Sequence, residues 1–242
     1  VWASGLRSEI KRPMRKSLKY LIKTDDSFFH PSTAGGHLLK QSQREWLQAA
    51  KQSSVSKQVV AIRHLKFDEQ LATEQESLLL EKLRSPDRSI VLHSIAAVES
   101  LKLASQPVAD ELQLLVESRD DEIRAKALMA LTKLGQLDEL TIGLAAKMID
   151  SSVRYVVFVG VFALSSLESV PDPVLRAAER GFVRAIQSCD YEFVGLFATA
   201  LDRWLDDAEP RFEQLFQDDE PDCLQIAVDA LRNVREQAVT AG

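Results

Sequence analysis

The chain has little of what turn-rich or disulfide-stabilised proteins use. Its 242 residues include only nine glycines and eight prolines. An all-β fold with frequent turns is therefore not expected, and long stretches rich in Ala, Leu, Glu, Gln and Lys favour helices. The two cysteines, Cys189 and Cys223, are too few for a disulfide framework and lack metal-ligand spacing. We interpret both as buried structural thiols of a reducing compartment, with the cytoplasm as the default location.

Long hydrophobic runs are also missing. The longest, YVVFVGVFAL from Tyr155 to Leu164, has about half of the ~20 residues that a membrane-spanning helix needs, so we assign it to the core. Because the sequence begins at Val1 rather than Met, we expect that processing or truncation has removed preceding residues. Whether these included a signal peptide or a membrane anchor is left open by the sequence.

Charge is unevenly distributed. The net charge is −6, yet residues 1–23 contain seven basic residues against Glu9 alone, a net of +6, which leaves −12 for the rest of the chain. Apolar residues recur every three or four positions among these basic residues, with Pro13 as an interruption, so residues 1–36 are predicted to form a basic arm and linker. Docking on the acidic body or on a protein partner is favoured over a membrane surface. The predicted docking residues are Arg7, Lys11, Arg12, Arg15, Lys16, Lys19 and Lys23.

The segment DDEIRAKALMALTKLG, residues 120–135, provides a template for a repeat. Its predicted core positions form one helical stripe at Ile123, Ala127, Leu128, Leu131 and Leu134. The same spacing returns from Ser54, Ile90, Val153, Phe193 and Cys223. The six copies begin 30 to 40 residues apart, a period typical of solenoids, in which each unit buries its apolar face against the next.

Each copy follows another helical segment, so the predicted unit is a helical hairpin. Pro107 and Pro173 suit the first turn of these preceding helices, where a missing N–H costs little. Asp120, Asp150 and Asp190 each stand three residues before a second helix's first core position, where a carboxylate can cap a helix. The predicted fold is all-α, with about six hairpins over residues 37–242.

These residues resemble HEAT repeats of the armadillo-like and PBS-lyase-type HEAT-like α-solenoid family. The resemblance covers roughly residues 37–238 and is carried by Asp120 with Ile123-Arg124 and by Asp150 with Val153-Arg154. It implies a right-handed α-solenoid. It also implies that Asp120, Arg124, Asp150 and Arg154 form a structural ladder between neighbouring repeats.

Catalytic motifs are absent from the sequence. The histidines His30, His37, His64 and His93 lie far apart and form no His-Glu pair, so no metal or other cofactor is expected. No dinucleotide-binding or phosphate-binding loop and no GxSxG motif occurs. Four acidic clusters lie in predicted turns, where capping and solubility are favoured over catalysis. These are Asp25-Asp26, Asp120-Asp121, Asp206-Asp207 and Asp218-Asp219-Glu220.

The face of each second helix opposite its core stripe is the predicted concave surface. In the fourth copy this face is apolar, with Tyr155, Val156 and Val159. An exposed binding groove and a helix covered on both sides by its own chain are both compatible with this pattern. The predicted partner-binding residues are Leu92, Met129, Tyr155, Val156, Val159, Leu196 and Ile226.

The favoured function is a non-catalytic scaffold or adaptor that binds a protein or peptide segment on the concave face. Two enzymatic alternatives come from HEAT-like families. A phycobilin-lyase-like protein would handle a tetrapyrrole beside Tyr155. An alkylpurine DNA glycosylase would need a basic cleft, which the acidic body disfavours. Its candidate residues are Lys126, Lys133, Arg154, Arg203 and Trp204.

Overall fold

The computed structural model describes residues 43–52, 54–205, 208–216 and 221–241. Over these residues the chain forms twelve α-helices and one short 3-10 helix, and no strand. The prediction of an all-α fold is confirmed. The described residues fall into two compact units, 43–166 and 167–241. The basic arm, its linker and the acidic clusters at Asp25-Asp26, Asp206-Asp207 and Asp218-Glu220 lie outside the described residues.

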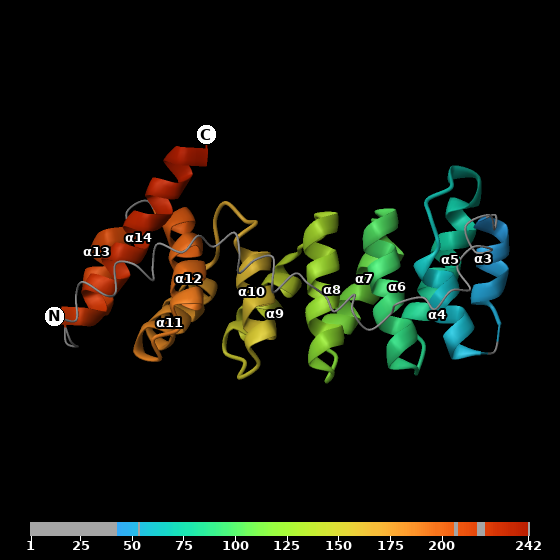
Figure 1. The fold of residues 1–242 in the computed structure, drawn as a ribbon, viewed down its shortest axis with the longest axis horizontal. Helices are drawn as coiled ribbons and strands as arrows, with labels where there is room; N and C mark the ends of the chain where they lie inside the picture. Colours follow the sequence, from blue (N-terminus) through green and yellow to red (C-terminus); the bar gives the residue numbers. More distant parts are fainter. Residues whose placement is uncertain (1–42, 53, 206–207, 217–220, 242) are drawn as a thin grey trace, which may run out of the picture. The chain divides into compact units, whose positions relative to one another are not determined.

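The N-terminal unit, residues 43–166, contains four successive helical hairpins (Figure 1). The first helices are α3 (Gln43–Ala50), α5 (Ala72–Leu83), α7 (Gln106–Val116) and α9 (Glu139–Ile149), with the 3-10 helix η3 (Glu69–Leu71) before α5. The second helices are α4 (Val55–Arg63), α6 (Arg88–Leu101), α8 (Asp121–Leu134) and α10 (Arg154–Leu164). The second helices pack side by side in chain order, and α5, α7 and α9 form another row. This two-row stacking is the predicted solenoid arrangement.

The predicted core stripe packs between these rows. In α8, Ile123, Ala127, Leu128 and Leu131 are buried, whereas Leu134 is half-buried. Val153 differs, because it precedes α10 as its N-cap residue and is 38% exposed. The stripe therefore places most core residues correctly and fails where a helix starts later than its template.

Aspartate caps some of the predicted helix starts. Asp120 Oδ1 accepts hydrogen bonds from the backbone N–H groups of Glu122 and Ile123, both at 3.0 Å, and so caps α8. Asp190 is the N-cap residue of α12, but its side chain makes no capping hydrogen bond. Asp150 is the C-cap residue of α9, since α10 begins only at Arg154. The predicted N-cap position is thus confirmed at Asp120 and Asp190, although only Asp120 makes the capping hydrogen bonds, and it is wrong at Asp150.

The C-terminal unit, residues 167–241, contains two more hairpins. Helix α11 (Asp172–Gln187) packs against α12 (Tyr191–Trp204), and α13 (Ala208–Leu215) packs against α14 (Pro221–Ala241). The Phe182 ring lies 4.7 Å from that of Phe212 between centroids, which joins the two hairpins.

The C-terminal unit also contains Trp204 and both cysteines. The Trp204 indole donates to the carbonyl of Leu167 at 3.3 Å. Cys189 is exposed and Cys223 is half-buried, so the prediction of buried thiols is wrong, because Cys189 follows the end of α11 in a left-handed conformation with φ 54°. Of the helices in the described part of the chain, none has both the length and the hydrophobicity to cross a membrane.

Candidate protein-binding face

The side of the N-terminal unit opposite its core is built from equivalent positions of α4, α6 and α8. We number each second helix from its first template position, with Ser54, Ile90 and Ile123 as position 0. Position 6 then points about 180° away from the centre of the core stripe. The outward residues, which we call the second-helix face, are Lys57, Val60, Leu92, His93, Ala96, Glu99, Glu122, Lys126, Met129 and Lys133.

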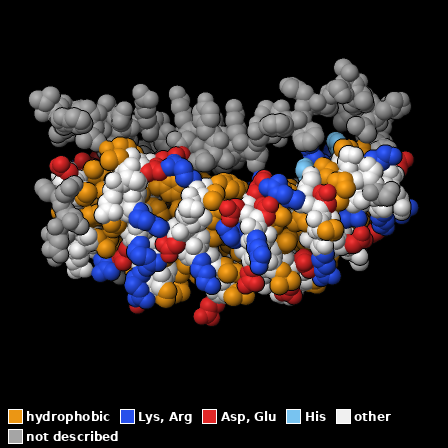
Figure 2. Space-filling model, turned by 90° about the horizontal axis from the view of Figure 1, so that it is seen from below, with side chains coloured by type: hydrophobic (Ala, Val, Ile, Leu, Met, Phe, Trp, Pro, Cys, Tyr) orange, Lys and Arg blue, Asp and Glu red, His pale blue; other side chains and the backbone are white. Residues whose placement is uncertain are grey.

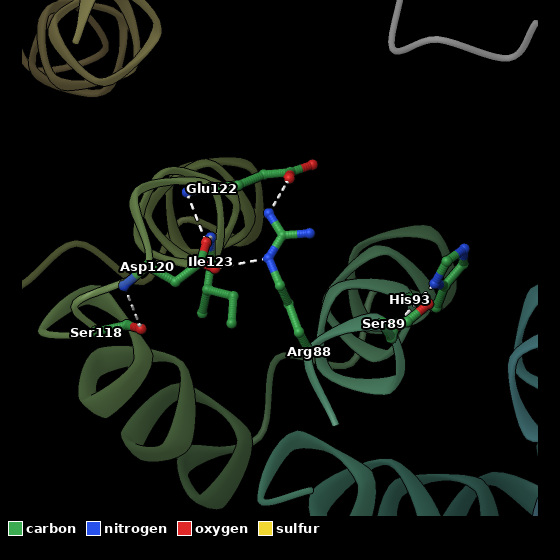
Figure 3. Close-up of polar contacts among 7 residues, drawn as sticks. All are labelled: Arg88, Ser89, His93, Ser118, Asp120, Glu122 and Ile123. Atoms are coloured by element: carbon green, nitrogen blue, oxygen red, sulfur yellow. Dashed lines mark hydrogen bonds and ion pairs between the residues drawn. The ribbon is translucent and has the colours of Figure 1, made fainter. Parts of the chain in front are cut away.

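Ion pairs join α6 to α8 at both ends of this face, and Figure 3 shows the end at Arg88. Arg88, at the start of α6, donates through Nε to Asp120 Oδ2 at 2.6 Å and through Nη2 to Glu122. Near the C-terminal ends, Lys133 donates to Glu99. In each pair, the template positions of the two residues differ by only one. Residues at equal positions of α6 and α8 therefore lie side by side.

Asp120 has two roles at this junction. Its pKa is lowered, first by the hydrogen bond from the Arg88 side chain and next by the backbone N–H of Ile123. The same hydrogen bond, together with that to Glu122, raises the pKa of Arg88. One carboxylate thus caps α8 and ties it to the preceding repeat.

Arg124, which was also predicted to be part of the ladder, contacts its own hairpin instead. Arg124 pairs with Asp121 of its own helix, and its Nη1 donates to the Ser118 carbonyl at 3.5 Å. Asp150 and Arg154 are both exposed, and each interacts with another group, so their place in the ladder stays a prediction. In the described inter-repeat link the cation is therefore Arg88, one residue after the α6 N-cap, rather than the Arg of the Ile-Arg pair.

An apolar row runs across the middle of the face at position 6. It consists of Val60 on α4, which is 40% exposed, exposed Ala96 on α6 and half-buried Met129 on α8. Leu92, at position 2 of α6, is half-buried beside it. Leu92 and Met129 were predicted from the sequence, whereas Val60 and Ala96 were not. Reading position 6 across every copy would have identified both.

Helix α10 does not continue this row. Val156 and Val159, at its positions 3 and 6, are fully buried, so their assignment as exposed partner-binding residues is wrong. The helix is apolar on nearly all sides and packs against α9 and α8, as expected of a buried helix. Gly160 allows close approach, because a Cβ there would lie 2.8 Å from the Ala145 carbonyl oxygen.

Tyr155 marks the end of the face. It is half-buried, and burial raises the pKa of its phenol, with smaller contributions from the charges of Glu122 and Glu99. Both carboxylates belong to the second-helix face, so the phenol lies within their electrostatic reach. The remaining predicted residues, Leu196 on α12 and Ile226 on α14, are half-buried in the C-terminal unit.

The described surface is chemically mixed. Seen from below in Figure 2, basic and acidic side chains alternate, and hydrophobic side chains lie between them. Within the described ranges, no group of three or more His, Cys, Asp or Glu residues could hold a metal ion. Glu99, Glu122 and Lys133 of the face link helices, and its central row offers apolar contact.

The helical hairpins stack with their first helices in one row and their second helices in another. This arrangement defines an armadillo- or HEAT-like helical-repeat fold. Solved structures with a similar fold include a designed armadillo repeat protein in complex with the peptide (KR)4, which is 15% identical, with 79% of this chain and 100% of that chain covered and a TM-score of 0.54. An engineered protein is 17% identical over 81% of this chain and 97% of its own, with a TM-score of 0.51. At such identities the similarity concerns the fold alone. No protein-family model and no curated protein matches the sequence.

Proposed function

We propose that the protein is a non-catalytic scaffold that binds a peptide segment of a protein partner on the second-helix face. The observation that carries this proposal is the row of Val60, Ala96 and Met129 on three adjacent helices, exposed or half-exposed although apolar. Apolar strips with a charged rim are typical of interaction sites. Leu92 and Tyr155 extend the strip on either side of Met129.

The ion pairs support a binding role because they fix the spacing of the helices. Arg88 with Asp120 and Lys133 with Glu99 hold α6 and α8 in register. A surface that is already ordered loses less conformational entropy on binding. The designed armadillo repeat protein in complex with (KR)4 supports peptide recognition by this class of fold.

The test is selection of binders from a random peptide library displayed on phage, followed by point variants of the full chain. Met129→Asp and Ala96→Glu place a charge in the apolar row, and each is expected to weaken the selected peptides at least tenfold. Leu114→Asp is the matched control, because Leu114 on α7 is 64% exposed and belongs to a first helix. A library that yields no binders, or binders that tolerate Met129→Asp, contradicts the proposal.

The two enzymatic alternatives have direct tests. An absorbance change on titration with a bilin would support the tetrapyrrole-handling alternative. A salt-sensitive mobility shift with duplex DNA, followed by release of an alkylated base, would support the glycosylase alternative.

We further propose that residues 1–36 form a separate arm that docks on the acidic part of its own chain. Residues 1–23 carry +6, and residues 167–242 carry −9 from seven basic and sixteen acidic residues. Carbodiimide cross-linking of lysine to carboxylate, read by mass spectrometry, should join Lys11, Lys16 or Lys19 to acidic residues beyond 166 at low salt. Cross-links only between molecules would favour a partner, and binding to anionic vesicles would favour a membrane.

A further inference from the structure

We propose that the partner of the second-helix face is an extended acidic segment with an apolar residue at every third position. This inference rests on the proposed function and specifies the chemistry of its partner. It follows from the charges next to the apolar row and from the spacing of the helices.

A basic row lies beside the apolar row, at position 3 of the same helices. It consists of Lys57 on α4, His93 on α6 and Lys126 on α8. Positions 3 and 6 of a helix lie on one side, one turn apart, so this row follows the apolar row across all three helices. A partner that covers Val60, Ala96 and Met129 would also pass these three side chains.

The basic row is available for a partner. Neither Lys57 nor Lys126 forms an ion pair with another residue of the described ranges. The two acidic residues of the face, Glu99 and Glu122, are bound by Lys133 and Arg88. The charge left over on the face is therefore positive, although residues 43–166 as a whole carry −2.

The side chains of this row are held in suitable positions. Lys126 is half-buried, and a partly buried lysine usually lays its aliphatic stem along the surface with the ammonium group in solvent. The Nδ1 atom of His93 donates to the Ser89 carbonyl at 2.7 Å, which fixes the ring and leaves Nε2 for a partner (Figure 3). Carboxylates accept hydrogen bonds from the lysine ammonium groups of this row.

The helix spacing sets the period of the segment. Packed helices lie about 8–10 Å apart. A polyproline II segment advances about 3.1 Å per residue and returns to the same side after three residues, or about 9.3 Å. An extended segment can therefore place one apolar residue on each of α4, α6 and α8, with acidic residues between them facing the basic row.

The sign of the charge distinguishes this partner from two others. The basic arm of this chain, with +6 over residues 1–23, is repelled by Lys57 and Lys126 and is not the expected occupant. The (KR)4 peptide bound by the designed armadillo repeat protein is also basic. This face should therefore prefer the opposite charge.

The test uses the full chain and two labelled peptides, (Leu-Glu-Ser)4 and (Leu-Lys-Ser)4, in a fluorescence anisotropy titration. We expect the acidic peptide to bind at least tenfold tighter, with an affinity that falls as salt rises. The double variant Lys57→Glu/Lys126→Glu should weaken the acidic peptide about tenfold and strengthen the basic one. The double variant Lys66→Glu/Lys147→Glu is the control, because it makes the same charge change at exposed residues outside the face.

The outcomes separate this inference from the proposed function. If the basic peptide binds as tightly as the acidic one and Met129→Asp still abolishes binding, the inference is overturned and the proposed function stands. No measurable binding of the acidic peptide also overturns the inference, while the library selection decides the proposed function. An equal loss with both double variants would show that only net charge matters, and would overturn the inference too.

Discussion

Asp120 combines a helix cap with an inter-repeat ion pair, and the two contributions can be separated by substitution. Asp120→Ala removes both and should lower the free energy of unfolding by about 1–2 kcal/mol. Asp120→Asn keeps a good N-cap residue but loses the charge that Arg88 binds, so it should cost less. Urea denaturation of the three proteins measures the difference. Equal losses for Ala and Asn would show that the cap contributes nothing.

The lowered pKa of Asp120 makes the ion-pair contribution depend on pH. Because the pKa is lower in the folded state than its ordinary value of about 3.9, the contribution is fully present above that value and is lost as pH falls through the folded pKa. The stability difference between wild type and Asp120→Asn should therefore be constant at neutral pH and shrink below pH about 4. A difference that stays constant to pH 2 would contradict this assignment.

Lys102 and Gly135 occupy the same position, 12 residues after position 0, at the ends of α6 and α8. Both have left-handed backbones, with φ 53° and 69°, which favour glycine over residues with a Cβ. Lys102→Gly should therefore raise the free energy of unfolding by about 0.5–1 kcal/mol, and Gly135→Lys should lower it by a similar amount. Thermal unfolding measures both. Destabilisation by Lys102→Gly would mean that the lysine side chain contributes more than its backbone strain costs.

Individual residues also show where sequence reasoning stops. Gly135 follows the rule that glycine is the usual residue just after the end of a helix. Lys102 gave no such signal, although its backbone has the same conformation. Asp150 matched the capping pattern, yet it is the C-cap residue of α9. It cannot be the N-cap residue of α10, because that helix begins only at Arg154. Spacing identifies the residues that can cap a helix, but packing decides where the helix starts.

At the scale of the helical element, α10 approaches α9 closely at Gly160. A Cβ there would lie 2.8 Å from the Ala145 carbonyl oxygen and 3.0 Å from Met148 Cβ. Gly160→Ala should therefore destabilise the protein by about 1–3 kcal/mol through overpacking. Gly143→Ala, in α9, is the control, because nothing lies within 4 Å of the added Cβ, and it should stabilise by about 0.5–1 kcal/mol. Chemical denaturation that ranks the two variants in the other order would contradict this packing.

The pattern of apolar residues predicted the elements better than it predicted their surfaces. In α8 one face is apolar, so the core stripe and the opposite face could both be assigned. In α10 apolar residues occur all round, and periodicity cannot distinguish a binding groove from a covered helix. Burial of Val156 and Val159 resolves this for α10. Position 6 of the template identifies Val60 and Ala96 in the sequence, whereas only the packing of α4, α6 and α8 places them side by side.

At the scale of the whole molecule, six hairpins were predicted, but the division into two units was not. The sequence contains a trace of this division, because the template positions Val153 and Phe193 are 40 residues apart, the longest interval in the series. The extra length includes the non-helical residues between α10 and α11, which also contain the boundary between the units at Ser166 and Leu167. Hydrophobic periodicity reports local helices and does not show which neighbouring pairs of hairpins pack most closely.

This boundary should be the first described segment that a protease cuts. Ser166, Glu168, Ser169 and Pro171 are exposed and non-helical, and exposed segments between compact units are preferred cleavage sites. A protease specific for glutamate should therefore cut after Glu168 before it cuts after Glu117 or Glu139, which lie beside helices that pack within one unit. Mass spectrometry of a short digestion identifies the order of cuts. The Glu168→Gln variant, which removes the site, should leave residues 43–205 uncut over the same time, whereas early cleavage after Glu117 or Glu139 would mean that individual hairpins open as readily as the boundary between the units.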